Sequence, residues 1–453
     1  MRLVVVGGGI AGLSAAWEAR RLAAERGEDV QITVLEAEPR AGGKLWTEQA
    51  DGISLEWGPD SFLASKPAAR ELAEELGLEL VEPLPNARRA YLLSGGELRP
   101  FPPGLVMGIP RGPSGMAGAV RSGIVGPEAA ARAAREPFVG GGVDAGTAAA
   151  ELRRRLGPGW STRLVEPLLE GVFGAPAEEL GMREVLPAFA GERSLVLAAR
   201  RMPAARGPAF LSIRGGMGAL AGGLRDSLAN EDLRLRTSAV AVVRRDDRFA
   251  VDVEDGSIEA DAVVVAIPAP VAARVLRPAA PAAAETLEAI RFSSSAVILL
   301  RWANRAVGRV RTASGYLVPR GEGLAHAACT WVTSKWPHRA TDLWLRAIVT
   351  SPEHLAAGDD ALTGRVADEV GIVMRATAPP LETRLHRWEH ALPVYAPGHF
   401  DRVARAEQDL PPGVVLAGAS YRGLGVPDCV VSGRAAARAA LKRRGQAPPR
   451  ESV

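Results

Sequence analysis

Three glycines near the start of the chain have the spacing of a phosphate-binding turn. Gly7, Gly9 and Gly12 match the pattern G-x-G-x-x-G. In such a turn the first glycine makes a tight bend, the second lets a pyrophosphate approach the backbone, and the third lets a helix pack against a strand. Ile10 and Ala11 would open that helix, whose unpaired N–H groups and partial positive charge attract phosphates. The spacing predicts a dinucleotide-binding site.

An acidic residue and a second glycine-rich stretch extend this fingerprint. Glu36 follows Gly12 at close to the ~20 residues expected for the partner of a ribose 2′-hydroxyl. Ala37 then leads into a stretch with a double glycine and flanking cations, which ends at Gly43 and Lys44. It can fold back along an extended dinucleotide and bring backbone N–H groups to the phosphates. A nicotinamide enzyme has no obvious use for it. The stretch resembles the segment that embraces FAD in the flavin-containing amine oxidase superfamily, and this resemblance implies FAD as the cofactor. No second glycine fingerprint follows a strand, so we expect no separate NAD(P)H domain.

The hydrophobic pattern predicts the elements that position these residues. Leu3–Val6 is a short apolar run rich in β-branched residues, as in a buried parallel strand. Leu13–Leu22 is rich in helix-forming residues, and Gln31–Leu35 is a second strand that ends at Glu36. Strand, glycine turn, helix, strand and acid thus appear in the order of a dinucleotide-binding unit.

The far end of the chain supplies another strand and helix. Val414–Gly418 reads as a strand, and a loop then leads to Asp428, a plausible N-cap for a helix from about Cys429 to Arg443. A helix aimed at a flavin would favour the negative charge of the reduced ring through its dipole. The alternative is an ordinary capped surface helix. The N-terminal unit needs further strands, which favours the first interpretation.

The middle of the chain contributes to the same domain. It offers a turn and helix, a short extended run, a hairpin and a buried strand, at Gly207–Leu228, Leu233–Val240, Phe249–Gly256 and Asp261–Pro268. We therefore predict a mixed α/β (α+β) fold. Its Rossmann-like FAD-binding domain would be discontinuous and built from residues 1–68, 207–270 and 408–446. The intervening segments would build the substrate site.

Composition excludes several other classes. The net charge is +3 over 453 residues, and no basic block indicates a nucleic-acid partner. The two cysteines, Cys329 and Cys429, lie in apolar surroundings, so we expect small packed residues and no disulfide framework. The six histidines lack metal-ligand spacing, so we expect no metal. No signal segment precedes Leu3 and no apolar run reaches the ~18 residues of a membrane span, so we expect a cytoplasmic protein, at most peripheral on a membrane.

Motifs along nearly the whole chain resemble the flavin-dependent protoporphyrinogen/coproporphyrinogen oxidase family, within the flavin amine oxidase superfamily. The resemblance rests on Gly52–Leu63, Val165–Gly174, Gly215–Met217, Ala391–Tyr395, Gly398-His399 and Gly423–Cys429. Ala328–Trp331 and Lys335–His338 are similar to the Gram-positive-type branch, whose members oxidise coproporphyrinogen III. Phe173-Gly174-Ala175 departs from the family's usual aromatic-alanine-glycine-acid run, which puts a polar substrate contact at this turn in doubt.

The resemblance implies a set of site residues. FAD contacts would come from Gly7 to Gly12, Glu36 and Ala37, Gly43 and Lys44, Gly58, Pro59, Asp60 and Ser61, the backbone of Val240, Trp388, and Val426, Pro427 and Asp428. Arg89 resembles a propionate-pairing arginine of relatives, with a surface arginine as the alternative, and Gly174 is the candidate substrate contact at its turn. Residues 85–205 would form a helical domain over the substrate cavity, and residues 271–407 a mixed-sheet substrate-binding domain.

The implied reaction is the six-electron oxidation of coproporphyrinogen III to coproporphyrin III in haem biosynthesis. Because a flavin accepts two electrons at a time, three cycles would be needed, each yielding hydrogen peroxide with oxygen as the acceptor. The pyrrole nitrogens can release protons to water, so we expect flavin-centred chemistry and assign no catalytic side chain. A ferrochelatase would be a downstream partner.

Other interpretations stay open. Protoporphyrinogen IX is the alternative substrate. A flavin amine oxidase would want an aromatic cage, yet the chain has only four tyrosines; Lys335 is either a lysine near the flavin, as in amine oxidases, or a solvent-exposed side chain. A carotenoid-desaturase-like enzyme shares only the N-terminal pattern. A scaffold that binds porphyrin without oxidising it is the alternative outside the enzymes.

Overall fold

A five-stranded parallel sheet is built around the first strand of the chain. The computed structural model describes residues 1–139, 141, 146–203, 207–308, 312–337 and 341–442. The strand order is β12-β2-β1-β16-β22, and every pairing is parallel. The strands are β12 (Asp232–Arg234), β2 (Gln31–Leu35), β1 (Arg2–Val6), β16 (Ala262–Val265) and β22 (Val414–Leu416). The predicted strands at 3–6, 31–35, within 261–268 and from 414 are thus confirmed.

Both faces of this sheet are covered, which explains why its strands are continuous apolar runs. Leu3 and Val5 point into a core with α1, α2, α11 and α18, whereas Val4 and Val6 point into a core on the opposite face. That second core includes the antiparallel sheet β13-β14-β15 and the helices α12, α13 and α17. The bounds are α1 (Ile10–Arg26), α2 (Ala68–Glu75), α11 (Gly218–Ser227), α18 (Val426–Lys442), β13 (Ala239–Arg245), β14 (Arg248–Val253), β15 (Gly256–Ala260), α12 (Ala269–Leu276), α13 (Pro281–Glu288) and α17 (His399–Gln408).

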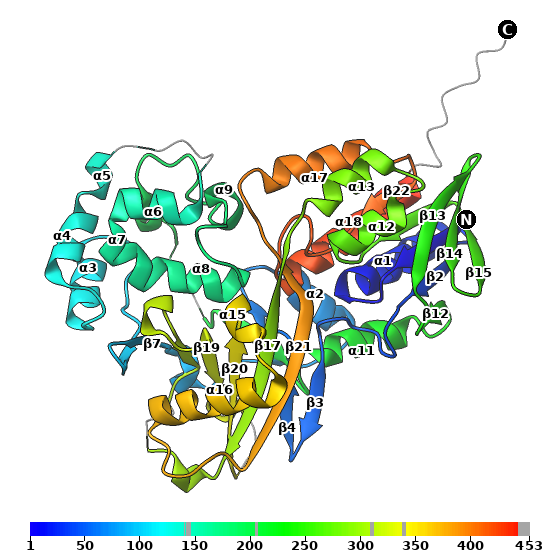
Figure 1. Cartoon of the computed structure of the whole chain (residues 1–453). Coiled ribbons are helices and arrows are strands. Elements are labelled where there is room, and N and C mark those ends of the chain that lie inside the picture. Colours follow the sequence, from blue (N-terminus) through cyan, green and yellow to red (C-terminus); the bar gives the residue numbers. More distant parts are fainter. Residues whose placement is uncertain (140, 142–145, 204–206, 309–311, 338–340, 443–453) are drawn as a thin grey trace.

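A seven-stranded mixed sheet forms a second body, in the lower part of Figure 1. Its order is β21-β17-β20-β19-β18-β7-β8, and α16 (Asp359–Met374) packs on one face through Leu362, Val366 and Val370. The strands are β21 (Glu382–Pro393), β17 (Phe292–Trp302), β20 (Leu343–Val349), β19 (Ala328–Trp331), β18 (Gly315–Leu317), β7 (Tyr91–Ser94) and β8 (Glu97–Pro100). β7 and β8 fall inside the predicted helical stretch 85–205 yet belong to this sheet.

A cluster of short helices lies at one side of the molecule (Figure 1). It has its own core, in which Trp160, Leu164, Phe189 and Leu195 are buried. The helices are α3 (Pro113–Arg121), α4 (Pro127–Ala134), α5 (Glu136–Val139), α6 (Ala148–Leu156), α7 (Pro158–Trp160), α8 (Glu166–Phe173), α9 (Met182–Val185) and α10 (Leu195–Arg201). None of the helices in the described part of the chain combines the length and the apolar character that crossing a bilayer would need.

Small strand pairs connect these bodies. The hairpin of β3 (Thr47–Ala50) and β4 (Ile53–Glu56) packs its Ile53 and Leu55 against Trp344 of β20. β11 (Phe210–Ile213) pairs with both β5 (Phe62–Leu63) and β6 (Leu80–Val81). Because β4 runs directly into Gly58–Ser61, the hairpin fixes that segment between the two sheets.

Candidate functional site

The glycine turn after β1 is tightly packed at Gly7 and Gly12 but open at Gly9, where a ligand would approach. Gly7 has a φ of 106°, and a Cβ there would lie 2.7 Å from the carbonyl oxygen of Ala266. A Cβ on Gly12 would overlap the carbonyl oxygen of Gly7, whereas one on Gly9 would meet no protein atom within 4 Å. The helix that begins at Ile10 has no side-chain cap. Its first N–H groups therefore face open space beside Gly9, the arrangement that binds phosphates.

Glu36 is held at the end of β2 by two backbone donors. Its Oε2 accepts a hydrogen bond from the N–H of Gly8 at 2.7 Å, and its Oε1 accepts one from Glu38 at 2.9 Å. Burial raises the pKa of this carboxyl, and the two backbone bonds oppose that rise. Each oxygen keeps a further lone pair, so the carboxylate can still accept a bond from a hydroxyl.

The stretch Arg40–Lys44 folds back onto the glycine turn, as the sequence predicts. The N–H of Gly42 donates to the carbonyl of Gly8 at 2.8 Å, and Arg40 donates to the carbonyl of Gly43 at 2.7 Å. Lys44 has no hydrogen-bond or ion-pair partner among the described residues, and burial lowers the pKa of its ammonium group. A half-buried lysine without a partner beside a glycine turn fits an anionic ligand such as a pyrophosphate.

Val240 lies at an irregularity in β13. The pairing with β14 shifts between Ala239 and Ala241, so Val240 has no partner in the strand ladder. Three residues earlier, the N–H of Thr237 donates to the carbonyl of Glu36 at 2.8 Å. The unpaired backbone of Val240 therefore lies close in sequence to a direct contact of the predicted ribose partner, where an adenine could bind.

The segment Gly58–Ser61 contacts the stretch Arg40–Lys44. We call the row of segments formed by Gly7–Gly12, Glu36, Arg40–Lys44 and Gly58–Ser61 the cofactor strip. A Cβ on Gly58 would overlap the carbonyl oxygen of Lys44, so the two segments touch. The carboxylate of Asp60 accepts bonds from Lys335 Nζ at 2.7 Å and from Ser61 Oγ at 2.8 Å. Burial alone would raise the pKa of Asp60, but Lys335 and Arg346 outweigh it and hold that pKa far below its usual range.

Trp388 fixes the start of this segment from β21. Its indole N–H donates to the carbonyl of Trp57 at 2.6 Å, immediately before Gly58. The rings of Trp46 and His386 lie edge-on to its ring, with the His386 ring centroid 4.3 Å away. Its N–H is thus used within the protein, so any contact of Trp388 with a cofactor would involve the ring.

The C-terminal helix begins earlier than the sequence suggests. α18 starts at Val426, so Asp428 lies in its first turn and is not its N-cap, and Arg443 lies outside the described residues. Asp428 pairs with Lys66 at 2.7 Å and accepts a bond from the N–H of Gly425 at 3.2 Å. Pro427 suits the first turn because its missing N–H needs no partner there. The Lys66 pair ties this helix start to the chain just beyond Ser61.

The two predicted substrate residues lie apart from this strip. Arg89 is exposed, and its carbonyl accepts a bond from Ser314 Oγ at 2.9 Å. Gly174 is buried after α8 with a φ of 64°, and a Cβ there would lie 2.8 Å from Leu392 Cδ1. Nothing in the described contacts joins either residue to Gly58–Ser61.

Four other residues can now be assigned an environment. Lys335 is 8% exposed, so the interpretation as a solvent-exposed side chain is wrong: its segment folds inward and Asp60 compensates its charge. Cys329 and Cys429 are buried free cysteines, as predicted, and burial raises the pKa of each thiol to about 12. Glu56 gave no sequence signal; burial raises its pKa to about 7, and it accepts bonds from the Met217 N–H and Thr47 Oγ1.

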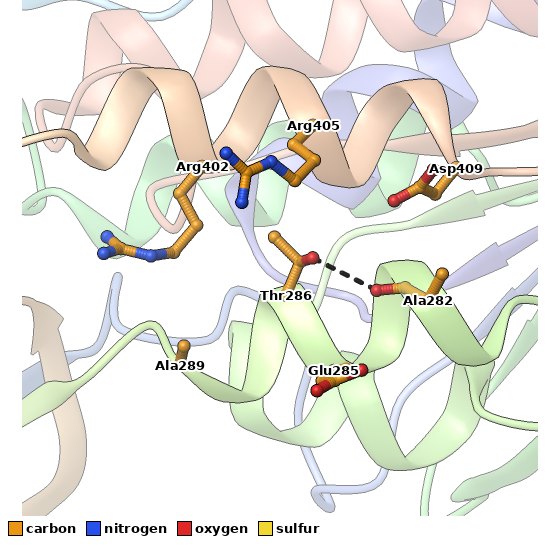
Figure 2. Close-up of a pocket in the computed structure, with 7 residues that line it drawn as sticks. All are labelled: Ala282, Glu285, Thr286, Ala289, Arg402, Arg405 and Asp409. Carbon is orange, nitrogen blue, oxygen red and sulfur yellow. Dashed lines mark hydrogen bonds between the residues drawn. The ribbon is translucent and has the colours of Figure 1, made fainter.

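A surface pocket of about 440 Å³ lies elsewhere, between α13 and α17. Figure 2 shows Arg402 and Arg405 on one helix facing Thr286 on the other. Thr286 donates to the carbonyl of Ala282 on its own helix. Two acids, Glu285 and Asp409, also line the pocket, so its positive and negative charges are equal in number. None of these residues belongs to the strip around Gly9, and the described residues hold no cluster of metal-ligand type.

The parallel sheet, the open glycine turn, Glu36 and the unpartnered Lys44 together define a dinucleotide-binding protein of the mixed α/β class. Comparison with known proteins then narrows the class. Residues 10–441 match the family model described as flavin containing amine oxidoreductase. The chain belongs to this family, so it is a flavin-dependent oxidoreductase whose cofactor is FAD.

Similar proteins cover nearly the whole chain. A coproporphyrinogen III oxidase of Mycobacterium leprae is 36% identical, over 95% of this chain and 96% of its own. A coproporphyrinogen III oxidase of Bacillus subtilis is 30% identical, over 97% of each. The crystal structure of a candidate protoporphyrinogen oxidase from Exiguobacterium sp. 255-15 superposes with a TM-score of 0.85 at 30% identity, over 98% of this chain and 99% of that one.

Proposed function

We propose that this chain uses FAD and oxygen to oxidise coproporphyrinogen III to coproporphyrin III, a step of haem biosynthesis. The observation that carries the proposal is the similarity over nearly the whole chain to proteins named coproporphyrinogen III oxidase. Protoporphyrinogen IX is the second candidate substrate, because the similar crystal structure carries that name.

The residues present fit the cofactor. We propose that Glu36 holds the adenosine ribose and that the bulged backbone of Val240 meets the adenine. Gly9 and Lys44 would take the pyrophosphate, since one leaves space and the other has no partner within the described protein. The remaining proposed contacts come from Gly7, Ile10, Ala11, Gly12, Ala37, Gly43, Gly58, Pro59, Asp60, Ser61, Trp388, Val426, Pro427 and Asp428.

The domain division is part of the proposal. Residues 1–68, 207–270 and 408–446 would bind FAD, residues 85–205 would cover the substrate, and residues 271–407 would provide the sheet against which it lies. The parallel sheet supports the first unit, because its strands come from those three stretches. The seven-stranded sheet supports the third, although β7 and β8 join it from residues 91–100.

Chemistry at the site divides between cofactor and protein. The bound flavin supplies the two-electron oxidation. The protein fixes Gly58–Ser61 through Asp60, Lys335 and Trp388, and the substrate would lie on the side of the seven-stranded sheet opposite α16. The pyrrole nitrogens can pass their protons to water, so the proposal assigns no general base. Arg89 would pair with a substrate propionate, for which a guanidinium is the fitting partner. Gly174 would bring the end of α8 close to β21.

The experiment that tests this function is porphyrin fluorescence in air, with the purified yellow protein and each porphyrinogen supplied separately. Faster oxidation of coproporphyrinogen III than of protoporphyrinogen IX is the expected result, and the reverse order would favour the second candidate. Oxidation of neither, with the flavin present, would overturn the proposal. Turnover of monoamines or polyamines would then indicate an amine oxidase, and stoichiometric porphyrin binding without flavin reduction would indicate a scaffold.

A further inference from the structure

Arg346 lies in the middle of β20 on the face of the sheet that looks toward the cofactor segment. The residues directly before and after it in the strand, Leu345 and Ala347, point to the other face and pack in the core that α16 covers. Trp344, two residues before Arg346, packs instead against the β3–β4 hairpin. Side chains alternate along a strand, so Arg346 shares the face of Trp344 and points toward the hairpin that leads into Gly58–Ser61.

This guanidinium is buried, and the described residues offer it no hydrogen bond. Arg346 is 6% exposed, and its Nε and Nη1 atoms have no hydrogen-bond partner in the part of the chain that the structure describes. Across the ladder it faces Leu299 on β17 and Thr330 on β19. A buried cation without hydrogen bonds is costly, so such a group indicates that something else completes its contacts.

Two acids, Asp60 and Glu56, lie within reach of the charge of Arg346 but do not supply its missing hydrogen bonds. The charge of Arg346 helps to hold the pKa of Asp60 low and opposes the burial that raises the pKa of Glu56, so both carboxyls are close enough to feel that charge. The Asp60 carboxylate is nevertheless bonded to Lys335 and Ser61. Glu56 is likewise occupied by the N–H of Met217 and by Thr47 Oγ1. Two cations, Lys335 and Arg346, therefore lie beside one strongly acidic carboxyl, and only Lys335 bonds to it.

We propose that Arg346 is an anion-binding position of the flavin site and takes a planar anionic acceptor that the protein does not supply. Two sources carry this chemistry: the flavin ring as it gains electrons, and a carboxylate of the substrate. A guanidinium fits either, because its fork donates two parallel N–H bonds. The inference rests on the proposed function, which places the cofactor at Gly58–Ser61.

The test uses the flavin-loaded protein with Arg346→Met and Arg346→Lys. Arg387→Met is the matched control, because Arg387 lies on the same sheet but bonds to Asp359 and the carbonyl of Leu355 on the opposite face. Two quantities are measured. One is the midpoint potential of the bound flavin without substrate. The other is the ratio of KM values for coproporphyrinogen III and for its tetramethyl ester, which lacks the carboxylates.

If the acceptor is the flavin, Arg346→Met lowers the equilibrium constant for flavin reduction at least tenfold, about 30 mV for a two-electron couple, and leaves the KM ratio unchanged. If it is a substrate carboxylate, the potential stays and the preference for the acid over the ester falls at least tenfold. In both cases Arg346→Lys is intermediate, because lysine keeps the charge without the fork. The potential is measured whether or not any porphyrinogen is oxidised, so failure of the proposed function remains a separate result.

Values for Arg346→Met that match the Arg387→Met control in both measurements would overturn the proposal and leave Arg346 as a counter-charge for Asp60 and Glu56. If the methionine variant does not fold, Arg346→Lys decides, because it keeps the charge that those acids need. A loss of about threefold or more in either quantity then supports anion binding, and wild-type values in both overturn it.

Discussion

The Nζ of Lys335 lies 2.7 Å from Oδ2 of Asp60 and joins two segments that are 275 residues apart in the chain. The side chains are only 10% and 14% exposed, so water screens this pair weakly. The pair ties the short helix α14 (Val332–Lys335), which follows β19, to the segment that follows β4. Together with the bond from Trp388 to the carbonyl of Trp57, it fixes the segment Gly58–Ser61 against the body formed by the seven-stranded sheet.

Breaking this pair should be costly. Lys335→Met leaves the Asp60 carboxylate buried beside Ser61 without its cation, and removal of one partner of a buried pair typically costs about 3–5 kcal/mol. Asp60→Asn should cost a similar amount, and the double variant less than the sum of the two. Urea unfolding of the two single variants and the double variant measures the coupling. Strict additivity would show that the two charges do not interact.

The same pair should make the protein sensitive to acid. The pKa of Asp60 is held below its unfolded value of about 3.9, so its stabilising contribution is present above that pH and is lost as the pH falls toward the folded pKa. Asp60→Asn should remove this part of the loss. We expect the difference in free energy of unfolding between wild type and Asp60→Asn to shrink below about pH 4. A difference that stays constant between pH 7 and pH 3 would contradict the assignment.

Glu56 should act in the opposite direction. Its pKa is raised to about 7 by burial, so its contribution is fully present below the unfolded value of about 4.3 and is lost as the pH rises through 7. Glu56→Gln can keep both the Met217 and the Thr47 contacts. We expect this variant to match the wild type near pH 5 and to be the more stable one at pH 8, by an amount of order 1–3 kcal/mol. Thermal unfolding at the two pH values checks the sign.

Two substitutions in the glycine turn should separate folding from cofactor binding. Gly9→Val places its side chain where the protein leaves open space, and its φ of −71° suits any residue. We expect a folded protein with little or no bound flavin. Gly12→Val would push into the Gly7 carbonyl and should fail to fold. Flavin absorbance and the melting temperature are measured for the two proteins. A Gly9→Val protein with a full complement of flavin would contradict the assignment of the pyrophosphate to this turn.

Tyr395 should stabilise the loop before α18. Its hydroxyl donates to the carbonyl of Ala419 at 2.8 Å and accepts from the N–H of Gly423 at 2.6 Å. Tyr395→Phe leaves both groups unpaired and should cost about 1–3 kcal/mol. Tyr421→Phe is the control, because the buried Tyr421 hydroxyl has no partner among the described residues, and its loss should be neutral or stabilising. Melting temperatures of the two variants, together with exchange of the Gly423 amide, test this contrast.

The local parts of the site were the predictable ones. Gly7–Gly12, Glu36 and the strands around them follow from spacing and apolar runs, because one short stretch both forms and uses the turn. The inward position of Lys335 could not be read from its own neighbourhood, since its partner Asp60 lies far away in sequence. Arg346 and Glu56 carry no motif, and their roles depend on which face of a strand they occupy. The start of α18 was misplaced because Asp428 resembles an N-cap, whereas Pro427 in the first turn is the better signal.

The nucleotide-binding sheet takes its last strand, β22, from residues 414–416, and α18 closes it by packing Gly433 against the backbone of Ala11. The helix that covers α1 follows the glycine turn by about four hundred residues, so a ribosome makes the turn long before it makes that helix. During synthesis the turn therefore waits, without one side of its support, while some four hundred residues emerge. A chain that stops before β22 lacks this support, and we expect it to bind little flavin.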